Sequence, residues 1–129
     1  MARELEAVVR QMLGALDAGD VDGLIRLGAD DIQGIDEISR RWNRGIEAVG
    51  GYLKQLASLV EEVRSEIGDV HEAAYGDIGI VTFWLEQDYT LEGKRIHVSC
   101  PTTTVLRREG GEWRYLLFHS IPLPEGDGA

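Results

Sequence analysis

The sequence lacks several features that would assign it to a familiar class. It has one cysteine, Cys100, so it cannot form an intramolecular disulfide, as is typical of proteins from reducing compartments. It has no apolar run near the ~20 residues that a membrane-spanning helix needs. Its start, MARELEAVVRQML, lacks the apolar core of a signal peptide. We therefore expect a soluble, cytoplasmic protein.

Basic residues are also scarce. Lys and Arg number 13 against 23 Asp and Glu, which gives a formal net charge of −10. Such a chain repels the phosphates of nucleic acids and of anionic membranes. The compact basic cluster RRWNR, residues 40–44, is too short to overturn that balance. We expect neither nucleic acid nor a membrane as a partner.

The remaining composition is that of an ordinary folded domain. Hydrophobic residues make up 43% of the chain, and its length is enough for one real core. We expect a single domain over residues 1–122. A flexible tail over 123–129 should follow, because PEGDGA is polar and rich in glycine.

Periodicity predicts helices first and strands second. Apolar residues recur at helical spacing from Leu5 to Leu16, over about 21–27, and over about 45–62. A short strand is expected at 32–36, followed by an irregular crossing, EISRRWNRG. Four long strands are expected at 63–75, 78–91, 95–108 and 113–121. Their connections, GD, EGK and EGGE, are hairpin turns, so the class is α+β with an antiparallel meander.

Two of the long strands are apolar on both faces. In the last strand Tyr115 and Leu117 share one face, and Leu116 and Phe118 share the other. A sheet with one solvated face should alternate apolar with polar residues. The helices can cover one face, and a second copy of the chain is the simplest cover for the other. We expect a homodimer; the alternative is that these side chains are simply exposed.

The order of these elements resembles the NTF2-like α+β cone fold. The motifs that carry the resemblance are LDAGDVDGLIRLGADDIQGID, NRGIEAVGGYL and GKRIHVSCPTTTVLRREGGEWRYLLFHS. They cover about residues 4–122 and look most like the SnoaL-like and ketosteroid-isomerase-like branch. The resemblance implies three N-terminal helices on a curved antiparallel sheet of four to five strands. It also implies a cavity between these layers and a dimer, but it is not specific for an activity.

Asp36 is the strongest candidate for chemistry. In isomerase-like relatives the acid at the matching place, a few residues after ADD, is the general base that moves a proton beside a carbonyl. The resemblance gives Asp36 this role, and a carboxylate in an apolar pocket suits it. Alternatively, Asp36 caps the strand or pairs with Arg40 or Arg41.

The other isomerase groups are missing. Such relatives use a tyrosine of the first helix and a protonated acid of the third long strand as donors to the developing oxyanion. Met12 and Thr103 occupy the matching places here. Met12 cannot donate and Thr103 is a weaker donor, which argues against steroid isomerase activity.

Strand alternation and the resemblance predict the wall of an apolar small-molecule pocket. The residues expected to face it are Met12, Leu53, Phe83, Leu85, Gln87, Tyr89, Ser99, Thr103, Leu116 and Phe118. Cys100 should point away. Trp42 is a candidate lid over the cavity or an interface anchor. The alternative is a filled core, and a bulge in any strand would invert its alternation.

No metal or cofactor is expected. His71, His97 and His119 lack metal-ligand spacing, and no glycine-rich phosphate loop joins a strand to a helix. Three functions stay open. The protein is a small isomerase, cyclase or hydrolase that acts on an apolar organic compound with Asp36 as general acid or base, a non-catalytic binding module, or a dimerisation domain with a filled interior.

Overall fold

A computed structural model describes residues 4–124, which form three helices and one six-stranded sheet. The helices are α1 (Glu4–Ala18), α2 (Val21–Leu27) and α3 (Ile46–Leu59). The strands are β1 (Gly28–Asp36), β2 (Asn43–Arg44), β3 (Val60–Tyr75), β4 (Ile78–Leu91), β5 (Lys94–Glu109) and β6 (Glu112–Ser120). The predicted α+β class is confirmed. Most of the predicted tail, residues 125–129, lies outside the described residues.

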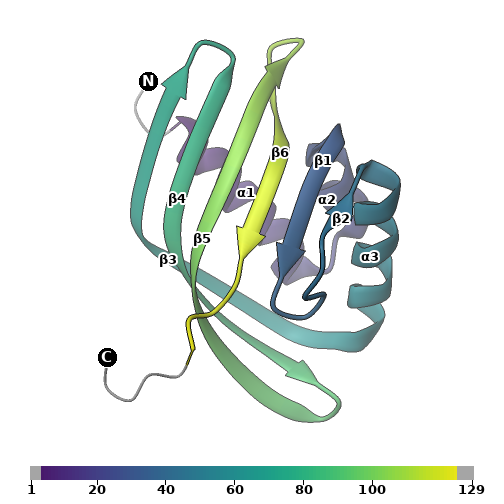
Figure 1. Cartoon of the computed structure of the whole chain (residues 1–129). Coiled ribbons are helices and arrows are strands. Elements are labelled where there is room, and N and C mark those ends of the chain that lie inside the picture. Colours follow the sequence, from purple (N-terminus) through teal and green to yellow (C-terminus); the bar gives the residue numbers. More distant parts are fainter. Residues whose placement is uncertain (1–3, 125–129) are drawn as a thin grey trace.

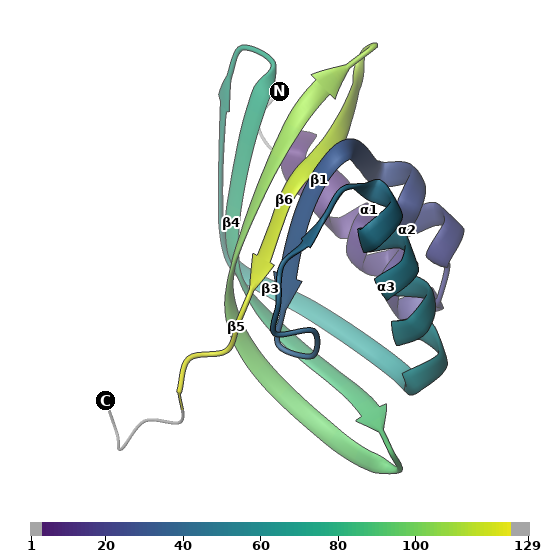
Figure 2. The same cartoon turned by 45° about the vertical axis from the view of Figure 1, so that its right-hand side comes forward.

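The helices lie on one face of the sheet. The strands follow the order β2-β1-β6-β5-β4-β3, and Figure 1 looks onto the face that the helices leave uncovered, with α1 and α2 behind it. Figure 2, turned by 45°, shows the sheet as a curved wall, with the β4–β5 hairpin sweeping beneath the helices. We call the helix-covered side the concave face and the opposite side the outer face.

Two details of the sheet differ from the prediction. It has six strands rather than four to five, because Asn43 and Arg44 of the supposed irregular crossing pair with β1 as strand β2. It is also not wholly antiparallel, since β1 runs parallel to β6. Side-chain alternation reports which residues are buried but not the direction of a neighbouring strand, so the sequence carried no signal for this pairing.

Helix α1 is fastened to β3 at both ends. Its buried face consists of Leu5, Val9 and Leu13. At its start the Glu72 carboxylate accepts hydrogen bonds from the backbone N–H groups of Leu5 and Glu6, at 3.3 and 2.9 Å. Toward its end Asp17 accepts from the N–H and the hydroxyl of Ser65, at 3.0 and 2.7 Å. A side chain of the sheet thus caps the helix and fixes its position.

Strand β6 contains a β-bulge. Between Tyr115 and Leu117 it has one residue more than β5 opposite, and that residue, Leu116, has no partner. A bulge shifts the alternation by one position. Tyr115 before the bulge and Phe118 after it therefore both point toward the helices.

Candidate functional site

A cavity of about 140 Å³ lies between the helices and the concave face of the sheet. Its wall is mostly aliphatic and comes from all three helices and from all six strands of the sheet. An apolar cavity of about 150 Å³ can hold a benzene molecule. The space therefore suits a molecule of about one ring.

The polar part of the wall is built around the end of β1. The polar side chains that line the cavity are Asp36, Glu37, Ser39, Asn43, Tyr52, Gln87, Tyr89, Tyr115 and Ser120. They come from the β1 turn, α3 and three strands of the sheet. The cavity thus combines an apolar wall with polar side chains that include two carboxylates.

Asp36 is held by the turn that follows it and by α3. Its Oδ1 accepts hydrogen bonds from the backbone N–H groups of Ile38 at 3.2 Å and Ser39 at 2.8 Å, as in an Asx turn. The Tyr52 hydroxyl lies 2.8 Å from Oδ1 and 2.9 Å from Oδ2 and donates to the carboxylate. Asp36 therefore caps the end of its strand and also faces the cavity.

The arginines considered as partners of Asp36 do not pair with it within residues 4–124. Arg40 donates instead to the carbonyl oxygen of Glu37 at 3.0 Å. Its own backbone N–H bonds the carbonyl of Asp36 at 2.9 Å, which closes the turn. The carboxylate of Asp36 is thus stabilised by hydrogen bonds rather than by an ion pair.

Glu37 is a second carboxylate at the cavity that sequence reasoning missed. Its Oε1 accepts a hydrogen bond from the hydroxyl of Tyr89, a β4 residue that is 3% exposed. Glu37 lies in a turn, where no periodicity shows which way a side chain points. Its place directly after Asp36 is the one signal that could have drawn attention to it.

Burial and nearby carboxylates raise the pKa values of two tyrosines and of the cysteine in the cavity wall. Desolvation raises the pKa of Tyr52, and the charge of Asp36 raises it further. Desolvation likewise raises the pKa of Tyr89, followed by its hydrogen bond to Glu37. Both phenols therefore stay protonated and donate. Burial also raises the pKa of the Cys100 thiol to about 11, so this thiol is a poor nucleophile at neutral pH.

The structure brings together most of the predicted pocket residues. Beside Asp36, the cavity is lined by Met12, Leu53, Leu85, Gln87, Tyr89 and Phe118. Phe83 lies on the same face of β4 but is buried in the core at 4% exposure. Leu116 is the unpaired bulge residue and does not contribute to the wall.

The faces predicted for β5 are wrong. The β4–β5 loop has two residues rather than the three of EGK, so Leu91 pairs with Lys94. A change of one residue in a hairpin loop exchanges the two faces of the following strand. Ser99 and Thr103 therefore lie on the outer face, and Cys100, predicted to point away, lines the cavity.

Trp42, a candidate lid or interface anchor, lies on the outer face and does not line the cavity. Its ring stacks on His119 with centroids 5.9 Å apart, and the Arg44 guanidinium lies 5.4 Å from its centroid. The side chain is 40% exposed. This position is compatible with the interface anchor considered from the sequence.

Residues 4–124 contain no cluster of three His, Cys, Asp or Glu side chains suited to a metal ion. His97 bonds Asp88 at 2.7 Å and Glu86 at 2.9 Å across β4 and β5, and these carboxylates raise its pKa. In the same part of the chain no helix is long and apolar enough to cross a bilayer.

Comparisons with known proteins agree with this architecture. The sequence matches the family of SnoaL-like domains over residues 5–124. No curated protein matches it significantly. The fold is similar to a putative calcium/calmodulin dependent protein kinase II association domain from Xanthomonas campestris, with a TM-score of 0.86, 21% identity, and coverage of 98% of this chain and 90% of that chain.

Two further solved structures have the same fold. One is a putative dehydratase from the NTF2-like family of Streptomyces avermitilis, with a TM-score of 0.86, 17% identity, and coverage of 94% of this chain and 95% of that chain. The other is a ketosteroid isomerase-like protein from Erwinia carotovora atroseptica, with a TM-score of 0.78, 19% identity, and coverage of 92% of each chain. The resemblance noted in the sequence is confirmed: the fold is the one found in proteins called NTF2-like, and the chain belongs to the family of SnoaL-like domains.

Proposed function

We propose that the protein binds a small, largely apolar organic molecule of about one ring in the cavity between the helices and the sheet. The observation that carries this proposal is the cavity itself, whose aliphatic wall is interrupted by the Asp36–Tyr52 and Glu37–Tyr89 pairs. Small-molecule sites typically combine an apolar wall with a few placed polar groups. The apolar wall supplies affinity, and the polar pairs orient the ligand.

Filling the cavity tests this proposal. Leu53→Trp places an indole in the wall, and we expect it to weaken binding of benzyl alcohol by about tenfold or more, because the added ring takes the ligand's space. The measurement is a chemical-shift titration of the ¹⁵N-labelled protein. Leu59→Trp is the control, since Leu59 lies on the same helix, is 47% exposed and does not line the cavity. Equal binding by both variants would contradict the proposal.

A second candidate is an enzyme of the isomerase, cyclase or hydrolase type with Asp36 as general acid or base. It is favoured by the presence of Asp36 in the wall of an apolar cavity and by structural likeness to proteins called a dehydratase and a ketosteroid isomerase-like protein. Against it, the carboxylate already accepts bonds from the turn and from Tyr52, and Met12 offers no donor to an oxyanion. Turnover of a carbonyl compound by the wild type but not by Asp36→Asn would favour the enzyme over the binding module.

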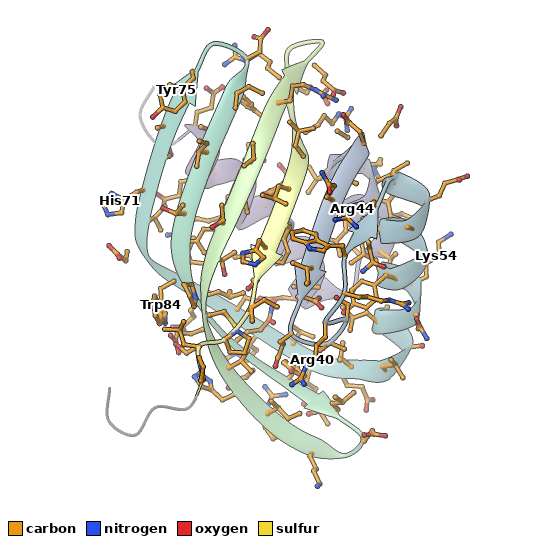
Figure 3. All side chains as sticks on the ribbon, in the orientation of Figure 1. Arg40, Arg44, Lys54, His71, Tyr75 and Trp84 are labelled. Carbon is orange, nitrogen blue, oxygen red and sulfur yellow. The ribbon has the colours of Figure 1, made fainter. Side chains whose placement is uncertain are left out.

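A homodimer through the outer face of the sheet is also proposed. In Figure 3, which looks onto this face, Trp84 lies toward β3 and Arg44, next to Trp42, lies on β2 at the other side. Trp84 is 37% exposed, and the strands between carry Ile80, Val105 and Leu117 in register. An apolar surface of this kind is typical of interfaces between copies of one chain. The likeness to an association domain supports the same proposal.

A further inference from the structure

The charged side chains that line the cavity are both acidic. Asp36 and Glu37 line it, and within residues 4–124 no Lys, Arg or His does. A second hollow of about 220 Å³ adjoins it. The two share the side chains of Leu16, Leu24, Leu53, Leu56, Val60 and Val63. The second hollow carries Asp17 and Glu62, again without a basic residue from the described part of the chain.

This charge distribution discriminates between ligands. A carboxylate or phosphate ligand would meet two acidic side chains in an apolar surrounding, where like charges repel more strongly than in water. The adjoining hollow adds two more acids, and the whole chain has a formal net charge of −10. A ligand with a positive charge is favoured by the acidic side chains of both hollows and by the net charge of the chain.

The two carboxylates differ in their free oxygen atoms. Both oxygens of Asp36 receive the hydroxyl of Tyr52, and Oδ1 also accepts from the turn. Glu37 accepts from Tyr89 through Oε1, whereas its Oε2 receives no hydrogen bond or ion pair from residues 4–124. A carboxylate oxygen at an apolar wall gains most from a charged N–H donor. Glu37 Oε2 is therefore the acceptor available to a ligand.

We propose that the ligand of this cavity is a protonated amine with an apolar body of about one ring, and that Glu37 accepts a hydrogen bond from its nitrogen. The inference rests on the proposed binding function and adds the chemical class of the ligand. The aliphatic wall holds the ring, while Tyr89, bonded to Oε1, keeps the Glu37 carboxylate turned so that Oε2 is free.

Three compounds with one ring and different charges test the proposal. Benzylamine, benzyl alcohol and benzoate are titrated into the wild-type protein at neutral pH, with binding followed by calorimetry and by chemical shifts. We expect benzylamine to bind about tenfold more tightly than benzyl alcohol, because a charge-assisted hydrogen bond is roughly twice as strong as a neutral one. Benzoate should bind most weakly. Benzoate binding as tightly as benzylamine would overturn the inference but leave the binding function standing, and failure of all three compounds would overturn the binding function.

Two variants assign the charge partner. Glu37→Gln keeps an acceptor for Tyr89 but removes the charge, so benzylamine should lose its advantage while benzyl alcohol changes by less than about twofold. Glu47→Gln, an exposed position in the first turn of α3 outside the cavity, makes the same change in net charge and should keep the advantage. Circular dichroism and the melting temperature verify that both variants fold. An unchanged advantage in Glu37→Gln would exclude Glu37 as the partner of the amine.

Discussion

Two phenol hydroxyls organise the polar part of the cavity at the residue scale. Tyr52 holds Asp36 and Tyr89 holds Glu37. The sequence singled out Asp36 and Tyr89 but not the other two. The inward direction of Tyr52 could be read from its place beside Leu53 in the helical stripe. Its bond to β1 could not, because that depends on the distance between α3 and the sheet.

We expect Tyr52→Phe to lower the free energy of unfolding by about 1–3 kcal/mol, because the half-buried Asp36 carboxylate loses the donor shared by both its oxygens. Urea denaturation at neutral pH measures the change. Tyr75→Phe removes the same hydroxyl from a side chain that is 66% exposed and should leave stability nearly unchanged. Equal stability of the two variants would show that the Tyr52 hydroxyl contributes little.

At the scale of whole elements, the inward-facing residues of the helices were predicted more reliably than those of the strands. An amphipathic stripe on a helix is broad, so Met12 and Leu53 line the cavity as expected even though the predicted end of the third helix was three residues late. A strand has a period of two, so one residue decides its face. Because the prediction treats EGK as a three-residue loop, it exchanges the two faces of β5 and assigns Ser99 and Thr103 to the wrong face.

The bulge in β6 is a second reason why side-chain alternation can assign a residue to the wrong face of a strand. Sequence reasoning placed Phe118 correctly and Leu116 incorrectly on one strand, because the unpaired residue at Leu116 shifts the pattern between them. A bulge is a property of the pair of strands, since it appears only when the residues of β5 and β6 are counted against each other. The sequence of β6 alone did not contain this information.

The cap of α1 gives a prediction at the same scale. Glu72→Ala removes the carboxylate that accepts the N–H groups of Leu5 and Glu6, and we expect it to reduce stability by about 0.5–2 kcal/mol. Glu66→Ala, an exposed position on the same strand, is the matched control. Thermal unfolding followed by circular dichroism compares the two. A Glu72 variant as stable as the control would mean that water replaces the cap at little cost.

At the scale of the whole molecule, one face of the sheet has no helix over it. Helices cover only the concave side (Figure 2), and Val105 lies on the other side between Ile80 and Leu117. The sequence predicted apolar residues on both faces of β6, and Leu117 does lie on the uncovered face. Its assignment of Tyr115 to the same face as Leu117 was wrong, because the bulge turns Tyr115 toward the helices. A measurement of mass tests the proposal that a second copy of the chain covers this face.

Light scattering after size exclusion should give the wild-type protein a mass twice the 14.3 kDa of the chain. Val105→Glu places a charge in the middle of the proposed interface and should shift the population to monomer. Tyr75→Glu, at the β3–β4 hairpin near the margin of the sheet (Figure 3), should remain dimeric. A wild-type protein that is monomeric at all concentrations would refute the proposed interface.

The parallel pairing of β1 with β6 also determines when the site can form. Asp36 lies beside Ser120 in this pair, although strands β2 to β5 lie between the two residues in the sequence. During synthesis the acidic turn is made early, but its neighbouring strand leaves the ribosome after all the others. Contacts between distant segments are the slow step of folding. The cavity, and with it the proposed ligand site, is therefore completed late in biogenesis, so a nascent chain that stops before β6 lacks the part of the wall that Tyr115, Phe118 and Ser120 supply.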